Sequence, residues 1–179
     1  MTIKRCNWVE NKEELYIKYH DEEWGKAKYD DKILFEMLIL ESFQAGLSWI
    51  TILKKRESFK AAFDDFDLEK IITYDDEKIF ELTQNKKIIR HKGKIESAIN
   101  NAKVFKEIQN KYGSFSNYIW GFTNGEIIKA EYKTESELSK KISEDLKRKG
   151  MKFVGPTIIY SYLESIGIID NHTKDCFLY

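Results

Sequence analysis

Cysteine and proline are almost missing from this chain of 179 residues, which contains two Cys and one Pro. Two cysteines cannot provide the disulfide framework of a small secreted protein. They are also too few for an iron–sulfur cluster, which is held by a larger set of cysteine ligands. With one proline and nine glycines, Pro-rich linkers and collagen-like segments are excluded as well.

Long apolar segments are missing too. A membrane-spanning helix needs about 18 or more apolar residues in a row, and the longest uncharged run, residues 42–53, is interrupted by Gln44, Gly46 and Ser48. Residues 4–14 carry mixed charges and lack the apolar stretch of a secretory signal. We therefore expect a cytoplasmic protein without a membrane partner.

The chain has no excess of positive charge, because 30 Lys and Arg balance 30 Asp and Glu. This balance excludes a histone-like protein that binds nucleic acid by its overall charge. The charges are nevertheless segregated, with acidic runs at residues 21–23 and 75–77 and basic clusters within 86–94 and 147–152. The charge balance therefore does not exclude contacts between these basic clusters and DNA phosphates.

Strand and hairpin signals are scarce, whereas apolar residues recur at helical spacing along much of the chain. Asp30 and Asp31 are candidate caps of the first helix. The periodic segments lie within residues 33–45, 49–59, 95–108, 138–146 and 158–166. Residues 125–134 form the most irregular segment, and neither a repeat nor a domain boundary is visible. We predict a single all-α domain over residues 1–179.

A basic, glycine-containing connection joins the last two predicted helices over residues 147–157. Gly155 lets the backbone come close to a ligand, and Pro156 suits the first turn of a helix, where no N–H is needed. The free amides at that helix start favour a DNA phosphate. The alternative is an ordinary pair of helices whose basic face is solvated.

Cysteines and histidines lie near both ends of the chain. His172 and Cys176 are spaced i and i+4, on one face of a helical turn, and Cys6 and His20 lie near the other end. Together they would form a tetrahedral Cys2His2 zinc site, which is structural because it leaves no position for water. The spacing alone favours the alternative of two buried thiols and two unrelated histidines.

One carboxylate occupies an apolar position in the first predicted helix. Glu41 lies on the stripe of Leu34, Met37 and Leu38, and a buried unpaired carboxylate is costly unless it is protonated or meets a cationic or hydrogen-bonding ligand. The alternatives are a glutamate at a helix boundary or one bonded to a tyrosine. Nearby aromatic residues belong either to the core or to a pocket for a flat, cationic ring: Trp8, Tyr16, Tyr19, Trp24 and Trp49.

Five motifs occur in order along the chain: Cys6-Asn7-Trp8, Tyr16 to Gly25, Leu40 to Trp49, Ile89 to Lys94 and Lys152 to Gly155. With them the chain resembles the DNA-3-methyladenine glycosylase I family of the helix-hairpin-helix glycosylase superfamily. The third motif is the most specific of the five. The resemblance runs from Cys6 to Cys176, which is essentially the whole chain.

The resemblance implies a DNA base-excision repair enzyme. It would hydrolyse the N-glycosidic bond of 3-methyladenine flipped out of double-stranded alkylated DNA, leaving the free base and an abasic site without strand cleavage. It also implies a helix-hairpin-helix DNA-binding element over roughly residues 135–167. One structural Zn²⁺, bound by Cys6, His20, His172 and Cys176, would tether the two ends of the chain, and we expect a monomer.

The same resemblance assigns roles to individual residues. Glu41 is the expected catalytic residue, and it would accept hydrogen bonds from the edge of the base. The base pocket would consist of Trp8, Tyr16, Tyr19, Trp24 and Trp49. DNA contacts are expected at Gln44, Gly46, Leu47, Lys152 and Gly155, with Leu47 as the wedge that enters the emptied base stack.

Asp170 is a departure from this pattern. Many members of the wider superfamily carry a catalytic Asp two residues before a His, whereas this family is usually described as lacking it. Asp170-Asn171-His172 has that spacing. Either Asp170 stabilises an oxocarbenium ion, or it caps a helix or supports a zinc-bound His172, and we favour the second interpretation.

Two other classes of protein are alternatives to a glycosylase. A zinc-stapled helical DNA-binding module without catalytic activity would account for the hairpin and the metal but not for Glu41. A zinc hydrolase would need an open coordination position and a motif such as HExxH, which the sequence lacks.

Overall fold

Helices account for nearly all of the regular structure in the computed structural model, which describes residues 3–179. The prediction of a single all-α domain is confirmed. In chain order the elements are η1 (Asn7–Val9), α1 (Glu14–Glu22), α2 (Asp31–Gln44), α3 (Trp49–Ala62), η2 (Asp64–Phe66), α4 (Leu68–Ile72), α5 (Asp76–Gln84), α6 (Lys92–Tyr112), α7 (Phe115–Gly121), β1 (Ile128–Lys129), α8 (Glu137–Arg148), α9 (Pro156–Ser165) and β2 (Ile169–Asp170).

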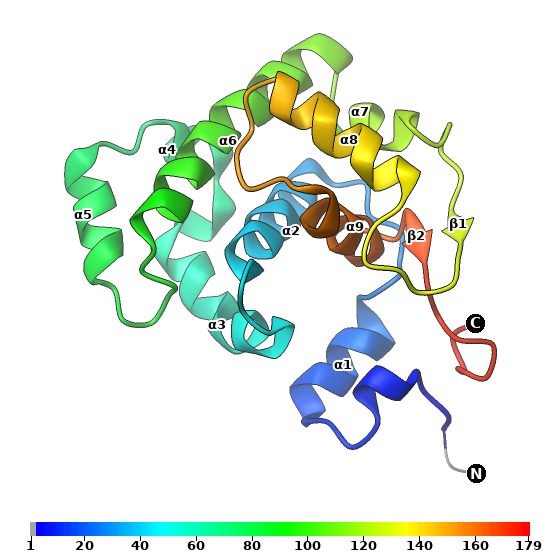
Figure 1. Ribbon diagram of the computed structural model, residues 1–179. Helices are drawn as coiled ribbons and strands as arrows, with labels where there is room; N and C mark the ends of the chain where they lie inside the picture. The colour runs from blue at the N-terminus through cyan, green and yellow to red at the C-terminus, as the bar shows by residue number, and fades with distance from the viewer. Residues whose placement is uncertain (1–2) are drawn as a thin grey trace.

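Helix α2 is the central element, and α3, α6, α7 and α9 pack around it (Figure 1). Its N-cap is Asp30, whose side chain accepts a hydrogen bond from the Ile33 amide at 3.0 Å. Every residue from Leu34 to Phe43 is buried, so the expected apolar stripe is buried and, over these residues, so is the rest of the helix surface. Ile33, where the periodic segment begins, is 39% exposed. Because α2 is surrounded, even its carboxyl at Glu41 is enclosed.

The periodic segments of the sequence correspond to α2, α3, α6, α8 and α9. The irregular segment 125–134 contains β1, which pairs in parallel with β2 so that Ile128 lies opposite Ile169. This pairing connects the loop before α8 to the segment that follows α9. It thereby fixes the start of the C-terminal tail, which carries Asp170 and His172.

The first and last described segments of the chain run close together on the side of the molecule that carries α1 (Figure 1). The Phe177 amide donates a hydrogen bond to the Lys4 carbonyl at 2.9 Å. The Thr173 amide approaches the Cys6 sulfur at 3.4 Å. Residues far apart in sequence are therefore in contact at the point where the cysteines and two of the histidines gather.

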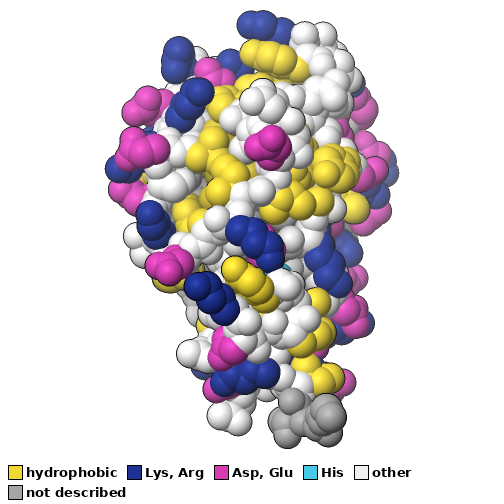
Figure 2. All heavy atoms as spheres, turned by 90° about the vertical axis from the view of Figure 1, so that its right-hand side faces the viewer, with side chains coloured by type: hydrophobic (Ala, Val, Ile, Leu, Met, Phe, Trp, Pro, Cys, Tyr) yellow, Lys and Arg dark blue, Asp and Glu magenta, His cyan; other side chains and the backbone are white. Residues whose placement is uncertain are grey.

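Acidic and basic side chains are interspersed on the face that carries the chain ends, with apolar side chains exposed between them (Figure 2). This face has no continuous basic surface of the kind that binds DNA by bulk charge. Within residues 3–179, no helix has the length and apolar character that crossing a membrane requires.

Candidate active site

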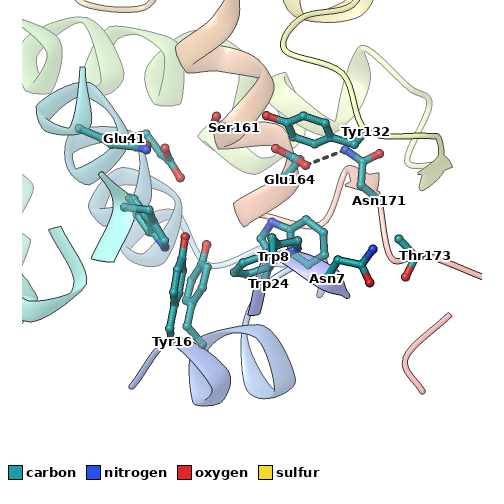
Figure 3. A pocket seen from close by; sticks show the side chains of 13 residues that line it. Asn7, Trp8, Tyr16, Trp24, Glu41, Tyr132, Ser161, Glu164, Asn171 and Thr173 are labelled. Atoms are coloured by element: carbon teal, nitrogen blue, oxygen red, sulfur yellow. Dashed lines mark hydrogen bonds between the residues drawn. The ribbon is translucent and has the colours of Figure 1, made fainter. Parts of the chain in front are cut away.

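A cavity of about 390 Å³ opens beside Glu41. That volume lies within the range of roughly 300–1,000 Å³ that is typical of small-molecule sites. The structure brings Glu41 and all five predicted pocket aromatics to its wall (Figure 3). The lining residues are Asn7, Trp8, Tyr16, Tyr19, Trp24, Glu41, Gln44, Trp49, Tyr132, Ser161, Glu164, Asn171 and Thr173.

Glu41 is only 3% exposed, and its Oε2 atom has no hydrogen-bond partner. Burial raises the pKa of the Glu41 carboxyl well above its usual range, and the negative charge of Glu164 raises it further. Burial therefore favours the protonated form of this carboxyl, and a cation that comes close favours the carboxylate. An unpaired buried oxygen in a cavity is what a ligand-binding carboxyl requires, and neither alternative from the sequence accounts for it.

The aromatic rings around Glu41 form a connected wall. Trp8 lies edge-on to Tyr16 and to Trp24, with ring centroids 5.0 Å apart in both pairs. Tyr19 and Trp49 are 5.4 Å apart. The indole nitrogens of Trp8 and Trp49 are buried without an acceptor, so these rings offer both flat faces and free N–H donors to a ligand.

The cavity wall contains two carboxyls and no Lys, Arg or His side chain. Aromatic faces attract cations through the ring quadrupole, and buried carboxyls gain stability when a positive charge approaches. The arrangement therefore favours a flat ligand that carries positive charge.

Six of the lining residues were not predicted from the sequence. Glu164 could have been found, because it is the one charged residue of α9 and follows Tyr160 by four residues on one face of the helix. The signal is the same one that identified Glu41. The others come from loops or carry no charge, so nothing in their local sequence distinguishes them: Asn7, Tyr132, Ser161, Asn171 and Thr173.

The last residue of α2 and the loop that follows it carry three of the predicted DNA contacts. Gln44 lines the cavity. Gly46 has a φ of +81°, a conformation that L side chains rarely adopt, which explains glycine at this turn. Leu47 follows it and is 41% exposed, as a residue that enters a base stack must be.

Lys94 holds this loop in place through hydrogen bonds to its backbone. It belongs to the basic cluster 86–94 of the sequence, yet its side chain is buried. Its ammonium group donates hydrogen bonds to the carbonyls of Phe43 at 2.9 Å and Ala45 at 2.6 Å. Lys94 therefore provides hydrogen-bond donors for the carbonyls at the C-terminal end of α2 and is not available to bind a phosphate.

The connection between α8 and α9 is held in a defined shape by Asn101. Its side chain donates to the Lys152 carbonyl and accepts from the Lys152 amide, each at 2.8 Å. Gly155 is the N-cap of α9, and no side chain caps that helix start. A β-carbon on Gly155 would meet nothing within 4 Å. The space beside the free backbone amides at the start of α9 is therefore open to an external group.

Three of the four predicted zinc ligands lie together. One ligand atom from each of Cys6, His20 and Cys176 lies within 4.8 Å of the others, and all three residues are buried. The Cys176 sulfur is 3.6 Å from Nε2 of His20. Two sulfurs and an imidazole nitrogen are the donor types that a structural zinc takes.

The fourth predicted ligand, His172, lies beside this group. Its ring centroid is 5.2 Å from that of His20, and its Nε2 atom is buried without a hydrogen-bond partner. The other ring nitrogens face carboxylates, at 2.7 Å from His20 to Asp21 and at 2.7 Å from His172 to Asp170. Carboxylates behind both imidazoles are typical of metal-binding histidines, so the residues present fit a bound zinc ion.

Asp170 is hydrogen-bonded to His172 and is not among the residues that line the cavity. Its Oδ1 atom accepts hydrogen bonds from the His172 amide at 3.0 Å and contacts Nδ1 of that ring. Gly25 leaves room for the same ring, because a β-carbon there would lie 2.6 Å from it. The geometry supports a positioning role for Asp170.

Comparison with known proteins gives consistent matches over the whole chain. The family described as Methyladenine glycosylase matches residues 8–179. The chain is 41% identical over 183 aligned positions to DNA-3-methyladenine glycosylase 1 of Escherichia coli K12, covering 99% of this chain and 97% of that protein.

Solved structures agree with the sequence matches. A structure of 3-methyladenine DNA glycosylase I from Staphylococcus aureus, on the recognition of 3-methyladenine, matches with a TM-score of 0.93 and 39% identity over 99% of this chain and 97% of that one. A variant of a 3-methyladenine DNA glycosylase I in complex with 3-methyladenine matches with a TM-score of 0.91 and 39% identity, covering 94% of each chain.

Proposed function

The chain belongs to the methyladenine glycosylase family, and we propose that it excises 3-methyladenine from alkylated DNA by hydrolysing the N-glycosidic bond. The observation that carries this function is the buried, unpaired carboxyl of Glu41 in an aromatic cavity that contains no cationic side chain. A zinc-stapled DNA-binding module without catalytic activity would not account for such a cavity.

Recognition begins with the charge of the lesion. Methylation at N3 gives the adenine of a nucleotide a positive charge, which suits aromatic faces and buried carboxyls. A damaged base also costs less to unstack and flip than an intact one. We assign the stacking surfaces to Tyr16, Trp49 and Trp8, and the acceptor for the edge of the base to Glu41.

The chemistry then follows from the leaving group. When the bond between the sugar carbon and the base breaks, its electron pair goes to the cationic base, which leaves as neutral 3-methyladenine. The sugar carbon becomes an oxocarbenium ion, a water molecule adds to it, and that water gives up one proton. Glu41 holds the base in line during this step, and no lysine attacks the sugar, so the product is an abasic site in an intact strand.

Contacts with the DNA come from two loops. Leu47 is the proposed wedge that fills the space of the flipped base, with Gln44 and Gly46 beside it. The free amides at the start of α9, with Gly155 and Lys152, would bind a phosphate of the duplex. We propose that a single copy of the chain makes these contacts on double-stranded DNA.

A structural zinc is the proposed link between the chain ends. Cys6, His20, His172 and Cys176 would hold it, and its role when bound is to fasten the C-terminal tail to the segment that carries Trp8. Asn171 and Thr173, which line the cavity, lie on either side of one of these ligands. The metal would therefore support the pocket without taking part in the reaction.

Asp170→Asn separates the two interpretations of Asp170. If Asp170 only supports His172, we expect excision to fall by less than about tenfold, while zinc affinity weakens by roughly 10–100-fold. Single-turnover excision and the zinc content of the purified variant measure the two effects. A loss of several orders of magnitude in excision with zinc retained would overturn the positioning role.

The proposed function is tested by the appearance of abasic sites. A labelled duplex is treated with a methylating agent, incubated with the protein and divided, and one half receives alkali. We expect strand breaks only in the alkali-treated half and only after methylation. Binding to the methylated duplex without any alkali-labile site would favour the non-catalytic module instead.

A further inference from the structure

Glu164 is a second carboxyl in the cavity, and the roles assigned above do not use it. It comes from α9, whereas Glu41 comes from α2. The two carboxyls face the same space from different walls (Figure 3). Glu164 is 6% exposed, so it is nearly as enclosed as Glu41.

The Glu164 side chain is held in one orientation by Asn171. The Asn171 amide donates to Oε1 of Glu164 at 2.6 Å and to the Tyr160 hydroxyl at 2.9 Å. Tyr160 and Glu164 are four residues apart on one face of α9. The carboxyl is therefore fixed before any ligand arrives, which is how residues that select a ligand are usually built.

The groups around Glu164 leave its charge uncompensated. The titratable side chains on the cavity wall are Glu41 from α2, Tyr16 and Tyr19 from α1, and Tyr132 from the loop before α8, and none of them is cationic. Tyr160 adds a hydroxyl from α9. A negative charge on Glu164 therefore has no positive partner among these side chains.

The two carboxyls differ in how readily they ionise. Burial, partly offset by the hydrogen bond from Asn171, raises the pKa of Glu164 to about 7. Burial raises the pKa of Glu41 well above its usual range, and no hydrogen bond offsets it. The hydrogen bond from Asn171 therefore favours the charged form of Glu164, whereas no such bond favours the charged form of Glu41.

We propose that Glu164 is a specificity-determining residue, the fixed carboxylate whose negative charge selects a cationic alkylated base over a neutral one. In this division of roles Glu41 binds the edge of the base, and Glu164 provides the charge that attracts it. The inference rests on the proposed excision of 3-methyladenine and adds the property by which the pocket distinguishes its substrate.

Glu164→Gln tests the charge without removing the contact, because a glutamine oxygen still accepts from Asn171. We expect kcat/KM for excision from methylated duplex to fall by roughly tenfold or more. The Kd for neutral free 3-methyladenine, measured at pH 8 by fluorescence of the cavity tryptophans, should change by less than about threefold. Equal losses for the cationic nucleotide and the neutral base, or no loss of excision, would overturn the inference.

Two controls accompany this variant. Glu57→Gln removes a carboxyl of which 85% is exposed, on α3, and should excise at the wild-type rate. Glu164→Asp keeps the charge and should retain the preference for the cationic nucleotide even if both affinities weaken. If wild-type protein releases no base, the proposed function fails; if wild type and Glu164→Gln excise equally, only the role of Glu164 fails.

The pH dependence of kcat/KM is a second measurement. A purely structural role of Glu164 would leave it unchanged. The charge of the methylated nucleotide does not titrate near neutral pH, whereas a group with a pKa of about 7 gains its negative charge as pH rises. Wild-type kcat/KM should therefore rise through about pH 7. This rise should be absent in Glu164→Gln, and its persistence there would assign it to another group.

Discussion

Replacing Glu41 by glutamine is expected to slow excision of 3-methyladenine by roughly 100–1,000-fold, the usual loss when one buried electrostatic contact to the reacting group is removed. The amide keeps the size of the side chain but cannot become negatively charged. It therefore loses the stabilisation of the cationic base inside a cavity with few other charges. Affinity for an undamaged duplex should change by less than about threefold, because Glu41 lies inside the cavity and away from the proposed phosphate contacts.

Single-turnover excision and duplex binding measure these two quantities on the same preparation. The melting temperature provides the control for folding. The pKa of Glu41 is raised in the folded protein, so its burial favours folding below the unfolded pKa and disfavours folding as pH rises above it. Glu41→Gln should then be at least as stable as wild type at pH 8. Equal losses of excision and binding would contradict the assignment of Glu41.

Replacing Cys176 by serine is expected to abolish the binding of one equivalent of zinc. Cys176 lies in the buried group with Cys6 and His20, and a serine hydroxyl is a poor substitute for a thiolate ligand. The loss should destabilise the protein by about 3–5 kcal/mol, as expected when a structural metal is removed. Metal content by atomic emission and thermal unfolding measure the two effects.

Asp175→Asn is the matched control, because it changes the neighbouring exposed side chain, which pairs with Lys4 at 3.6 Å. This variant should keep its zinc and its melting temperature. A chelator added to the wild-type protein should reproduce the lower melting temperature of Cys176→Ser. Unchanged zinc content in Cys176→Ser would refute the proposed ligand set.

The long helices could be predicted because their pattern is local. The periodic segments coincide with α2, α3, α6, α8 and α9, whose lengths are 10 to 21 residues. The remaining α-helices have 5 to 9 residues, too short for a clear period to emerge. The β1–β2 pair joins segments distant in sequence, and no local signal announces such a contact.

Site residues could be predicted where a polar side chain occupies an apolar position of the sequence. Residues without such a signal were missed. Glu41 stands out as a carboxyl in an apolar helix, and the aromatic residues around it followed from the resemblance. Lys94 shows that a basic run does not identify the phosphate contacts, since this lysine is buried against the carbonyls of Phe43 and Ala45. Asn171 carries no charge and depends on β2 and the chain end for its place, so only the folded structure reveals it.

If the cavity at Glu41 releases 3-methyladenine from DNA, the released base itself can be identified. Methylated duplex is incubated with the wild-type protein, and the soluble purines are separated and quantified over time. We expect free 3-methyladenine to accumulate in proportion to enzyme, while unmodified adenine stays in the DNA. A folded, zinc-loaded protein that binds the methylated duplex and releases no 3-methyladenine would contradict it.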